Sequence, residues 1–159
     1  MRARASRRVW DPALAVALWM AAAAAAPAAP PPGLPGTPAP PDVVAQLQTE
    51  VTAAAHRLER RDAEGVLRHV SEQYRTGPLT KPALRSQLRT LFALHDQMKV
   101  RVRIDAVRIV GDQAWIYSTG DLTGHLAWFG RWVPVLSWQR EPEVARKEDG
   151  VWRLFGHQR

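Results

Sequence analysis

The spacing of apolar residues changes once along this chain, near Asp96, and that change constrains the fold more than any other feature. Before it, apolar residues recur every three or four positions, as at Leu47, Val51 and Leu58. After it, apolar and polar residues alternate, beginning at Val100. The first spacing predicts amphipathic helices, and alternation predicts strands with one buried face. The sequence therefore predicts an α+β domain in which helices precede an antiparallel sheet.

Three helices are predicted in the first half of the domain. The first begins near Asp42, whose side chain can cap it. The second begins after Asp62 and is expected to continue to Tyr74, with Gly77-Pro78 ending it. The third begins after Thr80. Its buried stripe is predicted to contain Leu84, Leu88, Leu91, Phe92 and His95.

Four strands are predicted in the second half, at residues 99–110, 114–117, 127–139 and 151–157. The first strand carries Lys99, Arg101 and Arg103 on one solvated face. Turns or breaks are expected at 111–112 and 120–124, and a polar loop is expected at 141–147. Pro134 predicts a bulge or an edge position in the third strand.

The first 41 residues differ in composition from the rest. A basic start precedes an uncharged apolar run at 12–26, which is shorter than the roughly 20 residues that a membrane-spanning helix needs. This order is typical of a secretory signal, so we predict a signal peptide or N-terminal anchor at 1–28 and an exported, periplasmic or secreted protein. Arg7 and Arg8 also resemble a twin-arginine signal, which leaves the export route open.

Residues 29–41 are rich in proline and alanine, which predicts an extended linker because proline fixes φ and donates no hydrogen bond. The predicted domain then occupies 42–159. The chain has 159 residues, enough for one such domain, and it lacks cysteine, which excludes disulfides and thiolate metal sites.

Charge and histidine spacing exclude further classes of function. The net charge is +7, and Arg2, Arg4, Arg7 and Arg8 contribute much of it outside the predicted domain. A mildly basic domain without a clustered basic face argues against nucleic-acid binding. The five histidines include no pair spaced one helical turn apart, so we predict no metal site and no cofactor.

Four segments, in order, resemble the nuclear transport factor 2-like superfamily. Residues 61–74 look like the second helix of that family, and 107–115 look like its central hairpin. Residues 137–140 and 149–154 look like its last two strands. The resemblance implies a cone-shaped α+β fold, with three N-terminal helices packed in a strongly curved antiparallel sheet and a pocket at the wide end.

Members of that superfamily include isomerases, dehydratases, SnoaL-like cyclases and non-catalytic binding or assembly domains, and many are homodimers. Weak catalytic candidates are His157, Asp121 and Tyr117. His157 matches a position where many SnoaL-like proteins carry a histidine, and the alternative for it is a solvated residue near the end of the chain. For Asp121 a solvated turn residue is the favoured interpretation. The predicted pocket-lining residues are Tyr74, Trp115, Trp128, Trp132 and Trp138. The alternative for these aromatic residues is an ordinary core and a dimer face.

The resemblance, together with the lack of an identifiable catalytic pair, favours an exported module that binds a small ligand or takes part in an assembly. One alternative is a SnoaL-like enzyme that uses general acid–base catalysis in the pocket. A second is a membrane-anchored periplasmic scaffold that retains its N-terminal segment. The expected partners are a small apolar or aromatic ligand and a second copy bound through the sheet face.

Overall fold

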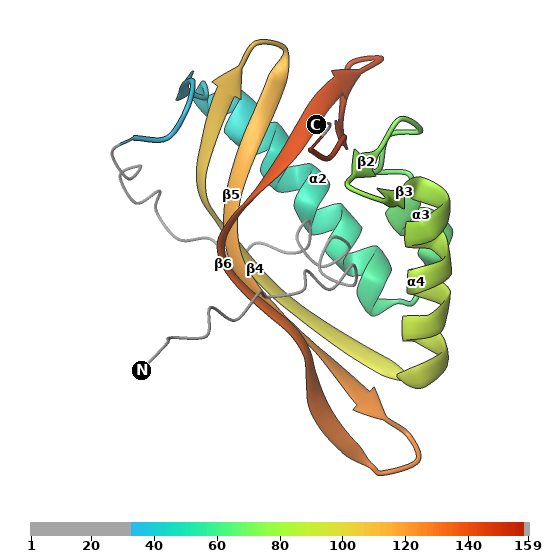
Figure 1. The fold of residues 1–159 in the computed structure, drawn as a ribbon. Helices are drawn as coiled ribbons and strands as arrows, with labels where there is room; N and C mark the ends of the chain where they lie inside the picture. Colours follow the sequence, from blue (N-terminus) through green and yellow to red (C-terminus); the bar gives the residue numbers. More distant parts are fainter. Residues whose placement is uncertain (1–32, 158–159) are drawn as a thin grey trace, which may run out of the picture.

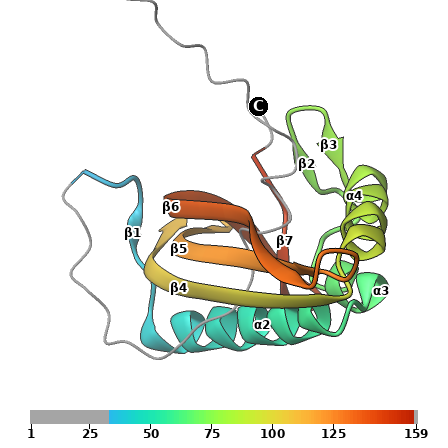
Figure 2. The same ribbon diagram turned by 90° about the horizontal axis from the view of Figure 1, so that it is seen from below.

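The computed structural model describes residues 33–157, so the predicted signal at 1–28 lies outside the described residues. A bent antiparallel sheet carries a long helix along one side, and two shorter helices lie beyond one end of the strands (Figures 1 and 2). The helices are α2 (Pro41–Glu59), α3 (Ala63–Leu67) and α4 (Lys81–Leu94). The short strands are β1 (Thr37–Pro38), β2 (Arg75–Thr76) and β3 (Leu79–Thr80). The longer strands are β4 (Gln97–Val110), β5 (Gln113–Leu126), β6 (Arg131–Glu148) and β7 (Val151–Leu154).

The predicted order of helices before a large antiparallel sheet is confirmed. The main sheet has five strands in the order β1-β4-β5-β6-β7, and β2 and β3 form a separate hairpin. The predicted stripe of α2 is buried against this sheet, with Leu47 and Leu58 fully covered. No helix in the part of the chain described by the structure is long and apolar enough to cross a membrane.

The first helix begins two residues earlier than predicted. Pro40, not Asp42, occupies the N-cap position, and Pro41 stands in the first turn. Proline suits this place because the N–H groups of the first turn have no acceptor within the helix, so the missing N–H of proline costs no hydrogen bond. Asp42 lies in the first turn, where its negative charge interacts favourably with the positive end of the helix dipole.

The second helix is much shorter than predicted, because the edge of the sheet captures the chain that follows it. The Asp62 side chain caps α3 by accepting a hydrogen bond from the Gly65 amide at 2.8 Å, as predicted. The helix ends at Leu67, and Val70 then forms a parallel bridge with Leu154 of β7. The helical prediction to Tyr74 was therefore wrong, since backbone groups near Val70 bond to β7 instead.

Two strands are longer than predicted. β5 continues through 120–124, where a break was expected, because its glycines allow close packing: a Cβ on Gly120 would collide with Trp138, and one on Gly124 with His95. β6 continues through 141–147, where a loop was expected. The segment stays extended because β6 pairs with a strand on each side: Ala145 lies between β5 and Leu154 of β7.

Part of the predicted linker belongs to the sheet. Thr37 and Pro38 pair with Ile109 and Arg108 of β4. The Arg108 guanidinium also donates to the carbonyl oxygens of Leu34 and Pro35. The extended, proline-rich conformation therefore adds an edge strand, which the prediction of an extended linker at 29–41 did not include.

The alternation of residues in β5 and β6 defines two faces of the sheet. Ala114 and Ile116 belong to the core that packs against α2, and we call their side the inner face. Successive strand residues point to opposite sides, so Trp115 and Tyr117 lie on what we call the outer face. Irregular pairing near Ile104 and Ser118 bends both strands, as bulges do.

A buried carboxyl cluster as the candidate functional site

The most unusual group in the interior is the carboxyl of Glu143 on β6. Glu143 is paired with Ile116 across the sheet, so its side chain lies on the inner face. The residue is only 3% exposed, and its Oε2 atom has no hydrogen-bond partner among the described residues. Burial raises the pKa of Glu143 to about 8; the Val144 amide opposes this rise, and the charge of Glu141 adds to it. At neutral pH the carboxyl is therefore mostly protonated and can donate a hydrogen bond.

The hydroxyl of Tyr74 lies in the same buried environment. Tyr74 is 2% exposed, and its hydroxyl has no hydrogen bond of ordinary geometry in the described part of the chain. Burial and the nearby Glu143 carboxyl raise the pKa of Tyr74, while an interaction with the Thr76 side chain opposes the rise. The phenol therefore stays protonated throughout the physiological range and provides a second neutral donor.

A third polar group continues the cluster along the inner face. Ser118 pairs with Glu141 across the strands, two positions from the Ile116–Glu143 pair, so these residues share one face. The buried Trp138 donates from Nε1 to the Ser118 hydroxyl at 3.1 Å. We call Tyr74, Ser118, Trp138, Glu141 and Glu143 the inner polar cluster.

Three of the predicted site residues lie on the outer face instead. Trp115 pairs with Val144, the neighbour of Glu143, and therefore points to the opposite side of the sheet. Its ring meets the His157 ring edge-on at 5.5 Å. Burial raises the pKa of Tyr117, and the charge of Arg108 opposes the rise.

Thr76 lies between the inner polar cluster and the residues of the outer face. The backbone amide of His157 donates to the Thr76 hydroxyl at 3.2 Å, and Thr76 also interacts with Tyr74. The structure thus brings His157 together with Trp115, and it brings Tyr74 together with Glu143.

Asp121, the other predicted catalytic residue, lies outside the cluster. Its carboxylate accepts a salt bridge from Arg101 at 3.2 Å, and the arginine side chain is 81% exposed. A guanidinium exposed to this degree is screened by solvent, so the pair contributes little to stability. Asp121 therefore belongs to a solvated ion pair, away from the buried carboxyl of Glu143.

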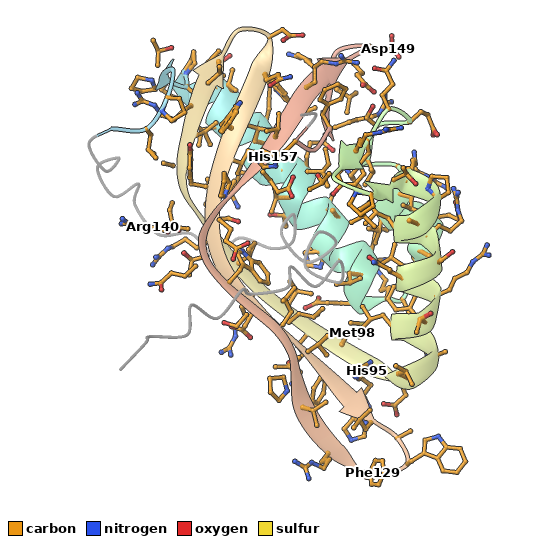
Figure 3. All side chains as sticks on the ribbon, in the orientation of Figure 1. His95, Met98, Phe129, Arg140, Asp149 and His157 are labelled. Carbon is orange, nitrogen blue, oxygen red and sulfur yellow. The ribbon has the colours of Figure 1, made fainter. Side chains whose placement is uncertain are left out.

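Two predicted pocket-lining tryptophans also lie away from the interior. Trp128 is 95% exposed, in the turn that joins β5 to β6. Trp132 is 38% exposed, and its ring contacts His125 and the Lys99 ammonium. The hairpin projects past the end of α4, as Figure 3 shows by the position of Phe129, and it leaves Trp128 almost fully exposed. Tyr74 and Trp138 alone among the predicted aromatic residues belong to the inner polar cluster.

Glu143 was not predicted as a site residue, because residues 141–147 were predicted to form a polar loop. This segment contains four charged residues, Glu141, Glu143, Arg146 and Lys147, which conceal the strand. Glu143, Val144 and Ala145 are all buried, so both faces of β6 are covered here and no alternation of apolar and polar residues identifies the strand. Residues 33–157 contain no group of three side chains suited to hold a metal ion.

Comparison with known proteins supports the fold. The sequence matches no protein-family model, and a search of curated proteins found no significant match. Solved structures do match, at sequence identities that establish the fold alone. A conserved protein from Planctomyces limnophilus has a TM-score of 0.63 at 11% identity, over 72% of this chain and 92% of that one.

Two further structures carry descriptions of a chemical class. A ketosteroid isomerase-like protein from Erwinia carotovora atroseptica has a TM-score of 0.58 at 18% identity, over 73% of this chain and 93% of that one. A Streptomyces avermitilis protein designated a dehydratase of the NTF2-like family has a TM-score of 0.57 at 18% identity, over 74% of this chain and 95% of that one. Bd1075 from Bdellovibrio bacteriovorus also matches, but this chain spans only 37% of its length. The protein has the nuclear transport factor 2-like fold.

Proposed function

We propose that the inner polar cluster is a small-molecule site in which Glu143 and Tyr74 act on a neutral, largely apolar ligand by proton transfer. The observation that carries this proposal is the fully buried carboxyl of Glu143, with a pKa of about 8 and an unpartnered Oε2 atom. An unpaired buried acid costs stability, and acids of this kind occur preferentially at functional sites.

The arrangement assigns a role to each group. At neutral pH the protonated Glu143 would donate its proton to an oxygen atom of the ligand, such as a hydroxyl that leaves or a carbonyl that is polarised. Glu141, whose charge raises the pKa of Glu143, would be the complementary base. Two carboxyls whose environments differ can divide acid and base roles in this way. The Tyr74 hydroxyl would hold the same ligand oxygen by a hydrogen bond.

The neighbours of similar fold agree with this class of chemistry without establishing it here. One is described as ketosteroid isomerase-like and another as a dehydratase. Because one fold carries many functions, the argument depends on the carboxyl cluster and not on the likeness.

A second candidate function is ligand binding without a reaction. It is favoured by the protonation state of the cluster, because protonated Glu143 and Tyr74 are both neutral donors that can hold a carbonyl group without transferring a proton. This candidate agrees with the binding module expected from the sequence.

The substitution Glu143→Gln separates these two functions, since an amide keeps a donor and an acceptor but cannot transfer a proton. The first step is native mass spectrometry of the protein from its own source, with denaturing mass spectrometry of any released molecule. For an enzyme, Glu143→Gln should keep binding that molecule while its turnover falls by about 10²–10⁴. Asp121→Asn is the matched control and should change neither quantity.

Other outcomes decide between the candidates. Binding that survives Glu143→Gln, with no turnover by the unsubstituted protein, would establish the binding function. A protein that binds no small molecule, and whose Glu143→Leu variant behaves identically in every assay, would exclude both. For the enzyme, activity should also fall above about pH 8, because ionisation of Glu143 removes the proton that it donates.

Export is part of the proposal and depends on residues 1–28, which lie outside the described residues. The basic start and the short apolar run support it. The N-terminal sequence of the mature protein tests it. A start near Ala29 indicates cleavage and export, whereas an intact start at Met1 in a membrane fraction indicates a retained anchor.

A further inference from the structure

Two adjacent aromatic side chains are almost fully exposed in the turn between β5 and β6. Trp128 is 95% exposed and Phe129 is 75% exposed. Figure 3 shows Phe129 at the far end of the hairpin, beyond the C-terminal end of α4. Single exposed apolar residues are common, but a pair of large aromatic residues at a projecting turn is typical of an interaction surface.

Further apolar surface lies beside this turn. Leu94, at the end of α4, is 58% exposed, and Trp132 of β6 is 38% exposed. The end of α4 is held beside the hairpin because Asp96 is bonded to His125, through an ion pair at 2.7 Å and a backbone hydrogen bond. We call residues 127–132 the aromatic tip.

The charge around the aromatic tip is positive. The segment at 127–132 contains one arginine and no acidic residue. Arg131 is exposed, and the Lys99 ammonium lies 4.6 Å from the centre of the Trp132 ring. The carboxylate of Asp96 is already paired with His125. The tip therefore combines exposed aromatic rings with cations that have no acidic counterpart in this segment.

A lipid surface fits this combination better than a second copy of the chain. Two aromatic side chains bury roughly 150–250 Å² each. The sum is well below the about 800 Å² per partner that a stable protein interface usually needs. At a membrane, by contrast, tryptophan favours the level of the headgroups, and nearby cations are attracted to anionic lipids.

We propose that the aromatic tip docks on an anionic lipid surface. Trp128 and Phe129 enter the headgroup region, and Arg131 and Lys99 contact lipid phosphates. This inference does not depend on the proposed acid–base site, because none of its residues belongs to the inner polar cluster.

The absence of native cysteine allows a fluorescent label to be placed at one position of the full chain. Phe129→Cys, labelled with an environment-sensitive nitrobenzoxadiazole dye, reports on the tip. Val151→Cys is the matched control, since Val151 is also partly exposed and follows the β6–β7 turn at Asp149, at the other end of the sheet (Figure 3). Vesicles of phosphatidylcholine with phosphatidylglycerol, with and without brominated chains, provide the surface.

Insertion predicts that the label at position 129 shifts to the blue and brightens by about twofold or more, because it leaves water for the interface. Brominated lipids should then quench it, while the label at position 151 stays unchanged. Added salt and Arg131→Glu should each weaken the response, since screening and charge reversal reduce attraction to anionic lipid.

Several results would overturn the proposal. A label at position 129 that stays in water on vesicle-bound protein would mean that another segment holds the chain to the membrane. A response that needs no vesicles and grows with protein concentration would identify a second copy as the occupant. If the protein bound no vesicles, the aromatic tip would not be a lipid-docking surface, and a protein partner would be the remaining occupant.

Discussion

The inner polar cluster and the aromatic tip each reverse a common preference of folded proteins, but in opposite directions. In the cluster, the acid Glu143 is buried without a charge partner. At the tip, the aromatic residues Trp128 and Phe129 are exposed without a cover. Glu143 lies on β6, and Trp128 and Phe129 lie in the turn that joins β5 to β6.

A buried acid and an exposed aromatic pair have different energetic consequences. Burial of an ionisable group changes the free energy of unfolding, because the folded and unfolded states then bind protons differently. Exposure of an apolar side chain at a turn leaves that free energy almost unchanged and instead makes surface available for binding. Stability measurements should therefore detect the cluster strongly and the tip hardly at all.

The largest expected effect is a loss of stability as pH rises. The pKa of Glu143 is about 8 in the folded state, against an ordinary value of 4.5. Folded protein holds a proton that unfolded protein releases, so this stabilisation is complete below about pH 4.5 and is lost as pH rises through 8. The free energy of unfolding, measured with urea, should fall by on the order of 3–5 kcal/mol between pH 5 and pH 9.

Glu143→Gln should remove most of that pH dependence, because an amide does not titrate. Glu148→Gln is the control. Hydrogen bonds from Ser71, Arg146 and Arg153 outweigh the effect of its burial and lower the pKa of Glu148, so its contribution changes only in more acidic solution. An equal slope in the unsubstituted protein and in Glu143→Gln would show that Glu143 does not carry the effect.

A smaller loss is expected where the hairpin leaves the body of the domain. A Cβ on Gly124 would meet the ring of His95, which is buried at the end of α4. Gly124→Ala must displace that ring and should lower the free energy of unfolding by about 2 kcal/mol. Thermal unfolding measures this loss. If Gly124→Ala left the free energy of unfolding unchanged, His95 would have to move freely, and the boundary between the two regions would be loosely packed.

Trp138→Phe tests the hydrogen bond within the cluster. The substitution removes the Nε1 donor that bonds Ser118 at 3.1 Å and keeps most of the buried apolar surface. The expected loss is about 1 kcal/mol, which is the usual net contribution of one hydrogen bond. Urea unfolding at pH 6 measures it while Glu143 stays protonated. A loss several times larger would indicate that the indole ring itself, and not its donor, organises the interior.

The smallest effect is expected at the aromatic tip. Trp128 is 95% exposed, so Trp128→Ala should change the free energy of unfolding by less than about 0.5 kcal/mol. The same urea experiment measures it. A loss above 1 kcal/mol would contradict the comparison, because it would show that the tip packs against the folded chain.

Much of the fold could be predicted from the spacing of apolar residues. Such spacing reports the side on which an element is buried, and this is why α2 and β4 appeared nearly where expected. The predicted extents failed where backbone bonding to a distant segment decided the outcome. The backbone of the residues on either side of Val70 bonds to Leu154, and Ala145 pairs with β5 on one side and with β7 on the other. The local spacing of apolar residues does not depend on such distant partners and therefore cannot predict them.

The candidate site was predicted only in part, for a related reason. Tyr74 and Trp138, which were predicted to line a pocket, are both buried in the structure, whereas Glu143 was hidden among the charges of its segment. His157 was found by likeness to a family, yet its ring contacts Trp115 on the outer face. Which face a residue takes depends on strand register, and a change of one position reverses it.

By itself, the sequence determined the order of helices and strands, the composition of the N-terminal segment and the absence of cysteine chemistry, because these properties depend on neighbouring residues or on composition. Only the tertiary structure decided that Glu143 is buried beside Tyr74 and that Trp128 is uncovered. The physical reason is that a side chain's solvent exposure, and with it a carboxyl's pKa, is set by segments distant in sequence that the fold brings against it, or leaves away from it.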